Sequence, residues 1–174
     1  MKPIVNIADA PVSHLLAHGD IFEMRMASFS DELGATRIGA NLTTVPPGKA
    51  AFPFHHHYAN EEHFFVVRGN GLLRFGETVH AVRPGDYIVA PAGGPEFAHQ
   101  LVNTGNEDLV YLGLSTRNAP EVVGYPDSGK TSVAAVPYGA PGPARFVVAD
   151  DQRGTTDYWD GEDGKAVRDT LNKK

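Results

Sequence analysis

Short runs of β-branched and aromatic residues, each soon followed by a turn rich in glycine or proline, are the feature that most limits how this chain folds. Strands favour such residues, and turns such as those at 46–49, 68–71 and 126–130 reverse the chain between them. Many short strands with close turns are typical of an all-β sandwich or barrel. We therefore predict strands within the runs 21–29, 37–45, 63–69, 72–76, 78–82, 86–91, 98–103, 109–116, 121–125, 131–136 and 145–149.

The composition narrows the class of protein. A chain of 174 residues fits one domain with its own core. Its 21 acidic and 15 basic residues give a net charge of −6, which argues against a nucleic-acid or anionic-membrane binder. The absence of cysteine excludes disulfides and thiolate metal sites. No apolar run is long enough for a signal peptide or a membrane helix, so we expect a cytoplasmic protein.

Helix signals are weak. Residues 10–19 are compatible with a short helix that ends at a glycine, and the polar tail 161–174 is compatible with a frayed helix or with disorder. We expect a single domain in three parts: an N-terminal segment with one strand (1–35), a compact barrel (36–116) and a C-terminal arm of extra strands (117–174).

A cluster of metal-capable side chains lies at the start of one predicted strand, in the stretch FHHHYANEEHFFVVRG. Because side chains two residues apart in a strand share a face, His55 and His57 point the same way and His56 points the other way. Glu62 shares a face with apolar residues of its strand. His99 shares a face with an apolar residue of a later strand in the same manner.

Three imidazoles and one carboxylate suit a divalent transition metal: Fe, Mn, Ni, Cu, Co or Zn. One alternative is a buried polar cluster without metal, in which each unpaired group costs about 1–3 kcal/mol. Four such groups would consume much of a typical stability of about 5–15 kcal/mol. The other alternative is that HHH is an exposed loop. Spacing alone favours the metal site.

The same residues resemble the first motif of the cupin superfamily, which is a glycine, His-x-His, three or four residues, a glutamate, six residues and a glycine. Here Gly48 is followed by His55 and His57, then four residues, Glu62, six residues and Gly69. Six residues separate Gly48 from His55, one more than in the motif, and this difference falls in a loop, where insertions are tolerated.

The second cupin motif resembles residues 85–103: Gly85, five residues, Pro91, Gly93, His99, three residues and Asn103. Five residues rather than two separate Gly93 from His99. The resemblance spans roughly residues 36–116. It implies a double-stranded β-helix, or jelly-roll, barrel with one metal held by His55, His57, Glu62 and His99. It also implies a homodimer, since cupins often dimerise.

For other side chains near the motifs, the sequence gives weaker indications of a functional role. Tyr58 is a candidate for hydrogen bonding to a ligand or substrate, or for packing at the barrel mouth, and Glu96 is a candidate acid or base, or a solvated loop carboxylate. His56 and His63 have the wrong parity for ligands, and we expect them to point outward or to lie behind the ligands. His80 is expected at the surface.

The sequence leaves two functions open. The first is a metal-dependent enzyme of dioxygenase, isomerase or decarboxylase type that acts on a small oxygen-rich molecule, with Glu62, Tyr58 and Glu96 as catalytic candidates. The second is a non-catalytic small-molecule binding or sensor protein with the same pocket. Cupins span all these chemistries, so the fold does not choose among them.

Overall fold

The strands dominate the fold, as the sequence predicts. The computed structural model describes residues 3–135 and 146–149. Two short 3-10 helices, η1 (Pro95–Phe97) and η2 (Pro126–Ser128), interrupt the strands. The strands are β1 (His14–His18), β2 (Phe22–Ser28), β3 (Ile38–Val45), β4 (His56–His57), β5 (Glu62–Arg68), β6 (Gly71–Phe75), β7 (Thr78–Val82), β8 (Tyr87–Ala90), β9 (His99–Val102), β10 (Leu109–Thr116), β11 (Glu121–Tyr125), β12 (Lys130–Ala134) and β13 (Phe146–Ala149).

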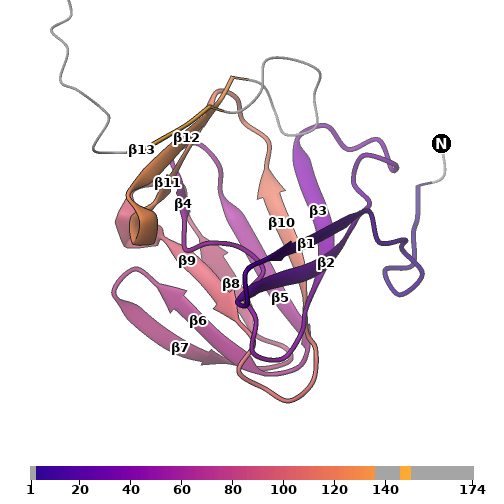
Figure 1. The fold of residues 1–174 in the computed structure, drawn as a ribbon. Coiled ribbons are helices and arrows are strands. Elements are labelled where there is room, and N and C mark those ends of the chain that lie inside the picture. The colour runs from indigo at the N-terminus through magenta and orange to yellow at the C-terminus, as the bar shows by residue number, and fades with distance from the viewer. Residues whose placement is uncertain (1–2, 136–145, 150–174) are drawn as a thin grey trace, which may run out of the picture.

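Of the three sheets that the described residues form, two face each other and make the barrel (Figure 1). One sheet has six strands in the order β1-β2-β3-β10-β5-β8, and the other has the order β7-β6-β9. The pairs within both are antiparallel. Bridges between Ala50 and Val102 and between His55 and His99 join the chain before β4 to β9. This is the all-β double-stranded β-helix expected from the sequence.

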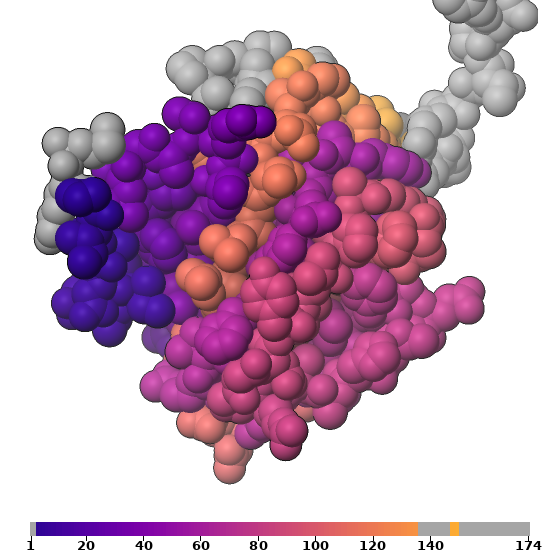
Figure 2. Space-filling view, turned by 180° about the vertical axis from the view of Figure 1, so that it is seen from behind, coloured from indigo at the N-terminus to yellow at the C-terminus, as the bar shows by residue number. Residues whose placement is uncertain are grey.

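The order of the larger sheet brings distant parts of the chain together. Strand β10 lies between β3 and β5 and pairs with both along most of its length. Figure 2 shows the opposite side of the molecule, where residues of β10, in orange, lie between those of β3 and β5. The face of this sheet that points away from the core exposes several large apolar side chains, namely Phe65, Val67, Tyr87 and Val89.

The core lies between the two barrel sheets. Along β5, successive side chains alternate between the core and the outer face. Val66 is fully buried, whereas its neighbours Phe65 and Val67 are each 40% exposed. The turn after β5 needs glycine, because Gly69 has a φ of +80° and a Cβ there would lie 2.4 Å from the Asp108 carbonyl oxygen. The core residues are Met24, Val45, Ala51, Val66, Leu73, Val82, Ile88, Leu101, Leu109 and Tyr111.

The C-terminal arm packs on the barrel through a third sheet, with the order β13-β12-β11-β4. Strand β11 pairs with β4 through Val123 opposite His57 and Gly124 opposite His56. A second contact joins η2 to β6, where the Arg74 guanidinium donates two hydrogen bonds to the Asp127 carboxylate at 2.7 and 2.9 Å. The arm is therefore attached to the strand that carries the histidines.

The helix predicted within residues 10–19 is wrong. Within this segment, His14–His18 form β1, which pairs along its whole length with β2. The open edge of β2 offers backbone partners to β1, and this pairing overrides a weak local preference for helix. The tail 161–174 lies outside the described residues. Among the described residues, no helix is both long and apolar enough to cross a membrane.

Candidate metal centre

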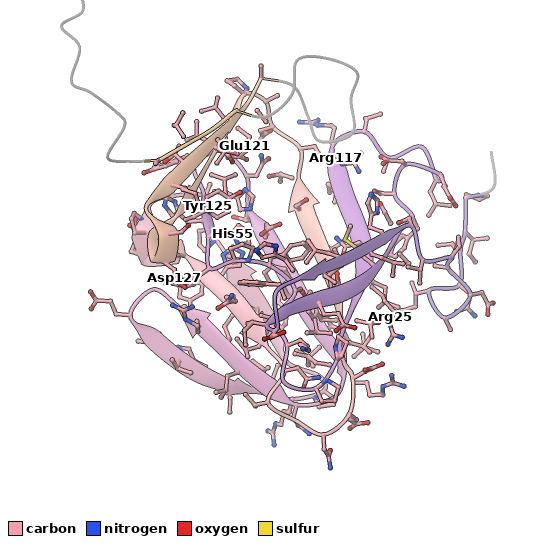
Figure 3. The ribbon with its side chains drawn as sticks, viewed as in Figure 1. Arg25, His55, Arg117, Glu121, Tyr125 and Asp127 are labelled. Carbon is pink, nitrogen blue, oxygen red and sulfur yellow. The ribbon has the colours of Figure 1, made fainter. Side chains whose placement is uncertain are left out.

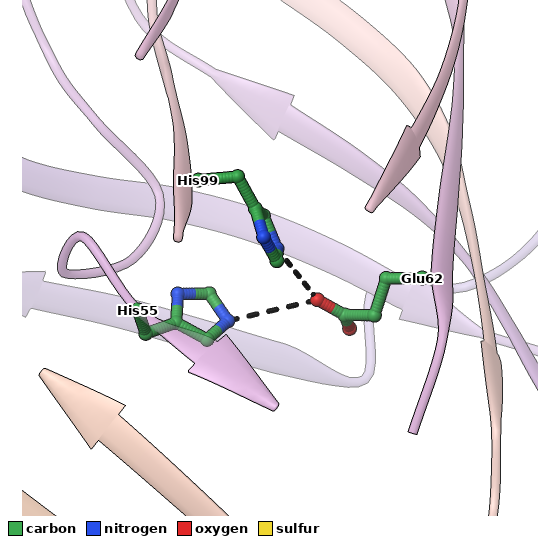
Figure 4. A group of neighbouring side chains, drawn as sticks. All are labelled: His55, Glu62 and His99. Carbon is green, nitrogen blue, oxygen red and sulfur yellow. Dashed lines mark hydrogen bonds and ion pairs between the residues drawn. The ribbon is translucent and has the colours of Figure 1, made fainter. Parts of the chain in front are cut away.

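Four polar side chains from three parts of the chain meet inside one end of the barrel. Glu62 begins β5 and points to the interior, as its parity predicts. His99 begins β9, and the backbone bridge to His55 brings the first histidine beside it. His57 is held in place by the pairing of β4 with β11. Figure 4 shows His55, Glu62 and His99 from these separate elements turned toward one another.

The Nε2 atoms of all three histidines converge on one carboxylate oxygen. Glu62 Oε2 lies 2.9 Å from His99 Nε2, 3.3 Å from His57 Nε2 and 3.6 Å from His55 Nε2. The ligand atoms of His55, Glu62 and His99 all lie within 4.8 Å of one another. This spacing is compatible with one shared cation. The group contains three of the four ligands predicted from the sequence and does not include His57.

The other ring nitrogens show which tautomer two of these histidines adopt. His55 Nδ1 lies 2.8 Å from the Pro53 carbonyl oxygen, and His99 Nδ1 lies 3.1 Å from the Phe97 carbonyl oxygen. A carbonyl can only accept, so each Nδ1 donates, and in the neutral ring the Nε2 lone pair then faces Glu62. A lone pair and a carboxylate repel unless a proton or a cation lies between them. The arrangement therefore fits a metal ion.

His57 supplies a second observation that fits a metal. Both of its ring nitrogens are buried, and neither makes a hydrogen bond of acceptable geometry within the described part of the chain. Nε2 nevertheless lies 3.3 Å from Glu62 Oε2, and Nδ1 lies 3.6 Å from Glu121 Oε2. Buried polar nitrogens without partners cost stability, and a bound cation would satisfy Nε2.

The charges of the cluster are strongly coupled. Burial lowers the pKa of His55. Burial would also lower the pKa of His57, but the Glu121 and Glu62 carboxylates outweigh it and raise that pKa to about 9. Burial would raise the pKa of Glu62, but the three imidazoles hold it well below its usual range. Without metal, Glu62 is therefore an anion and His57 carries a proton at neutral pH.

A dependence of stability on pH follows for the metal-free protein. His57 has a folded pKa of about 9 and an ordinary value of 6.5, so its contribution is full below about 6.5 and is lost as the pH rises through 9. We expect this loss to be about 3 kcal/mol. Chemical unfolding in chelator, compared with His57→Gln at each pH, measures it. An advantage of the wild type that grows above pH 9 would contradict the assignment.

Aromatic side chains surround the cluster. Phe64 lies 5.4 Å from His99 between ring centroids, and Phe52 lies 6.5 Å from His55. Tyr125 of β11 stacks on His55 at 6.2 Å with an interplanar angle of 28°. Tyr111 is 3% exposed, and burial together with the Glu62 charge raises its pKa, so the phenol stays neutral. These walls exclude much of the water from the ligand atoms.

The structure does not bring Tyr58 and Glu96 to the cluster. Tyr58 is 54% exposed, and its ring meets the edge of His56 at 4.8 Å. Glu96 is exposed and accepts a hydrogen bond from the Gly94 N–H at 3.3 Å. No hydrogen bond, ion pair or ring contact joins either side chain to a proposed ligand in the described residues, so their catalytic roles stay predictions.

Three further histidines near the two motifs, His56, His63 and His80, differ in burial. His63 and His80 lie on outward faces, as expected from the sequence. His56 is not outward: it is 3% exposed, and its Nδ1 lies 2.9 Å from the Gly93 carbonyl oxygen. Its ring lies against Gly124 of β11, the residue paired opposite it, which has no side chain.

Sequence reasoning missed the residues that β11 contributes. Glu121 and Tyr125 share a face of this strand with Val123, which is 2% exposed. A carboxylate on the same face as a buried valine was a signal that the acid had a buried partner. The pairing of β11 with β4 is non-local, and no pattern in the sequence identifies it. Figure 3 shows Glu121 and Tyr125 on the side of the barrel where His55 lies.

The fold and the cluster together define the class of protein. Residues 41–115 match the family model described as a cupin domain, so this part of the chain is a cupin domain. The family predicted from the two motifs is therefore confirmed.

Three proteins are similar to this chain in sequence or in structure. Auxin-binding protein 1 of Arabidopsis thaliana is 32% identical over 141 residues, which cover 72% of this chain; the chain spans 65% of that relative, less than two thirds of its length. A proposed sugar phosphate isomerase of Acidithiobacillus ferrooxidans is 27% identical with a TM-score of 0.67, covering 77% of this chain and 81% of that one. A sugar phosphate isomerase of Silicibacter pomeroyi is 22% identical with a TM-score of 0.73, covering 89% and 98%, and shows the fold alone.

Proposed function

We propose that this chain is a metal-dependent enzyme of dioxygenase, isomerase or decarboxylase type that acts on a small oxygen-rich molecule. The observation that carries the proposal is the convergence of three Nε2 atoms on Glu62 Oε2 inside an aromatic-walled end of the barrel. The similarity to a proposed isomerase at 27% identity supports the enzyme class.

The proposed ligands are His55, His57, Glu62 and His99, and the proposed ion is one of Fe, Mn, Ni, Cu, Co or Zn. Four protein ligands leave positions open on an ion of higher coordination number, whereas a structural site is usually closed. When bound, such an ion supplies a Lewis acid or an oxygen-activating centre. The side chains of His55, His57 and Glu62 are 15–20% exposed, whereas that of His99 is 5% exposed, which supports access from the side of the first three.

The surroundings of the cluster favour a small substrate whose oxygen atoms bind at the metal. No ion pair in the described residues joins a lysine or an arginine to the cluster, so an acidic group would find its counter-charge at the metal. The aromatic walls would contact the rest of the molecule. The low pKa of Glu62 favours its role as a ligand and weakens it as a general base.

The second candidate is a binding or sensor cupin without turnover. One observation favours it: the relative at 32% identity is named for binding auxin. The same cluster and walls would then hold a ligand that is released unchanged. Fold similarity does not separate the two functions.

The experiment that tests the proposal combines metal loading with a substrate panel. Metal-free protein is loaded separately with Fe(II), Mn(II), Ni(II), Cu(II), Co(II) and Zn(II). Each form is incubated with hydroxy acids, keto acids, sugars, sugar phosphates and polyphenols, and product formation and oxygen uptake are measured. Turnover that disappears in His99→Ala supports the enzyme. Tight binding of a panel member or of auxin, without turnover by any metal form, replaces the enzyme with the binding protein.

A homodimer and a cytoplasmic location remain proposals, as does the absence of nucleic-acid and membrane partners. The apolar side chains on the outer face of β5 and β8 support self-association, because large exposed apolar groups often mark interfaces. Light scattering of the purified protein would decide the oligomeric state.

A further inference from the structure

Glu121 is a buried carboxylate that the proposed ligand set leaves unexplained. It begins β11, outside the residues that match the cupin model, and is 7% exposed. Its only ion-pair partner among the described residues is His57, whose Nδ1 lies 3.6 Å from Glu121 Oε2. Removing a carboxylate from water is costly, so a buried one needs several compensating contacts.

Asn60 fixes the orientation of this carboxylate. Its Nδ2 donates hydrogen bonds to Glu121 Oε2 and to the Asn118 carbonyl oxygen, and its Oδ1 accepts from Thr116 Oγ1 at 2.9 Å and from the Asn118 N–H at 2.6 Å. The Ala59 N–H donates to Glu121 Oε1 at 3.2 Å. All the hydrogen-bonding groups of the Asn60 amide are in use, so its orientation is fixed. The bonds from Asn60 and Ala59 in turn fix the Glu121 carboxylate with Oε2 toward His57.

The three proposed ligand histidines differ in the group that faces the Nδ1 atom. His55 and His99 each meet a carbonyl two residues earlier in the chain. His57 has no such carbonyl contact, and the group that faces its Nδ1 comes from β11. A carboxylate behind an imidazole favours the Nδ1–H tautomer and makes Nε2 a stronger donor to a metal.

We propose that Glu121 is a positioning residue that orients His57 toward the metal, so that the C-terminal arm completes the metal centre. The inference rests on the proposed metal function. Charge supports it: with neutral histidines, the carboxylates of Glu62 and Glu121 together balance one divalent ion in a buried site. The arm is in this respect part of the site and not a peripheral addition to the barrel.

The test compares two arm carboxylates, both of which contact the barrel. Glu121→Gln keeps the size of the side chain and removes its charge next to His57. Asp127→Asn weakens the contact of η2 with Arg74 and touches no proposed ligand. We expect Glu121→Gln to weaken Co(II) binding about 10–100-fold and to change the visible absorption of bound Co(II). We expect Asp127→Asn to leave both unchanged.

A double-mutant cycle separates positioning from a general structural role. If Glu121 acts through His57, Glu121→Gln causes little further loss of Co(II) affinity in a His57→Gln background. An equal loss in both backgrounds, or wild-type affinity and spectrum in Glu121→Gln, overturns the inference. Failure of the wild type itself to bind metal overturns the proposed function first, and is recognised before any variant is compared.

Discussion

Replacement of Glu62 by alanine is expected to remove metal from the purified protein, from about one ion per chain to a small fraction. Glu62 Oε2 is the atom on which all three Nε2 atoms converge, so its loss leaves three imidazoles around a vacant centre. Outer partners of a metal site alone are worth about 10–100-fold in affinity, and a direct ligand is worth more. Alanine at His55, His57 or His99 is expected to act in the same direction. Elemental analysis together with a competition titration measures the effect.

Two histidines serve as controls for this series. His80→Ala changes an exposed residue of β7 and should leave metal content unchanged. His56→Ala removes a buried ring next to two ligands and should lower the unfolding temperature without lowering metal content. Equal loss of metal from His56→Ala and His57→Ala would show that strand parity does not select the ligands.

Gly124→Val is expected to be strongly destabilising, more than the other glycine substitutions in the described part of the arm. A Cβ at position 124 would lie 2.2 Å from His56 Nε2, because β11 and β4 pair at this point. The His56 ring cannot easily move, since it is buried and its Nδ1 contacts the Gly93 carbonyl oxygen. Overpacking of this kind costs about 1–3 kcal/mol, and more where the neighbour is fixed. Chemical unfolding of the metal-free protein measures the cost.

The double variant His56→Ala, Gly124→Val identifies the cause. Removing the ring frees the space that the new side chain needs, so the double variant should be more stable than the sum of the single effects implies. Strictly additive effects would mean that the damage from position 124 arises elsewhere, for example in the strand backbone of β11.

The barrel was predictable because its signals are local. In β5 the parity of the strand puts Glu62 on the same face as Phe64 and Val66, which predicts an inward carboxylate. In the structure Glu62 points inward. The same parity argument placed His99 on the interior face of β9. Histidine spacing and strand periodicity act over a few residues, which a single sequence displays directly.

The features that were missed depend on contacts between distant residues. Residues 10–19 are locally compatible with a short helix, and the pairing of β1 with β2 that overrides it cannot be recognised from these residues alone. The burial of His56 and the approach of Glu121 to His57 both follow from one pairing between strands more than 60 residues apart. Neither strand carries a residue pattern that identifies the other.

The β4–β11 pairing also limits how the protein can be redesigned. An arm exchanged with that of another cupin would have to match residues 56–60 as well as the barrel, because Glu121 and Asn60 meet across this boundary. A hybrid that combines this arm with another barrel would have Glu121 without its partner Asn60. A hybrid that combines this barrel with another arm would have Asn60 without Glu121. Tyr125, at the other end of β11, has a ring that is only partly buried against His55, so we expect position 125 to tolerate variation better. Libraries aimed at new ligands should therefore vary position 125 and keep 60, 121 and 124 together.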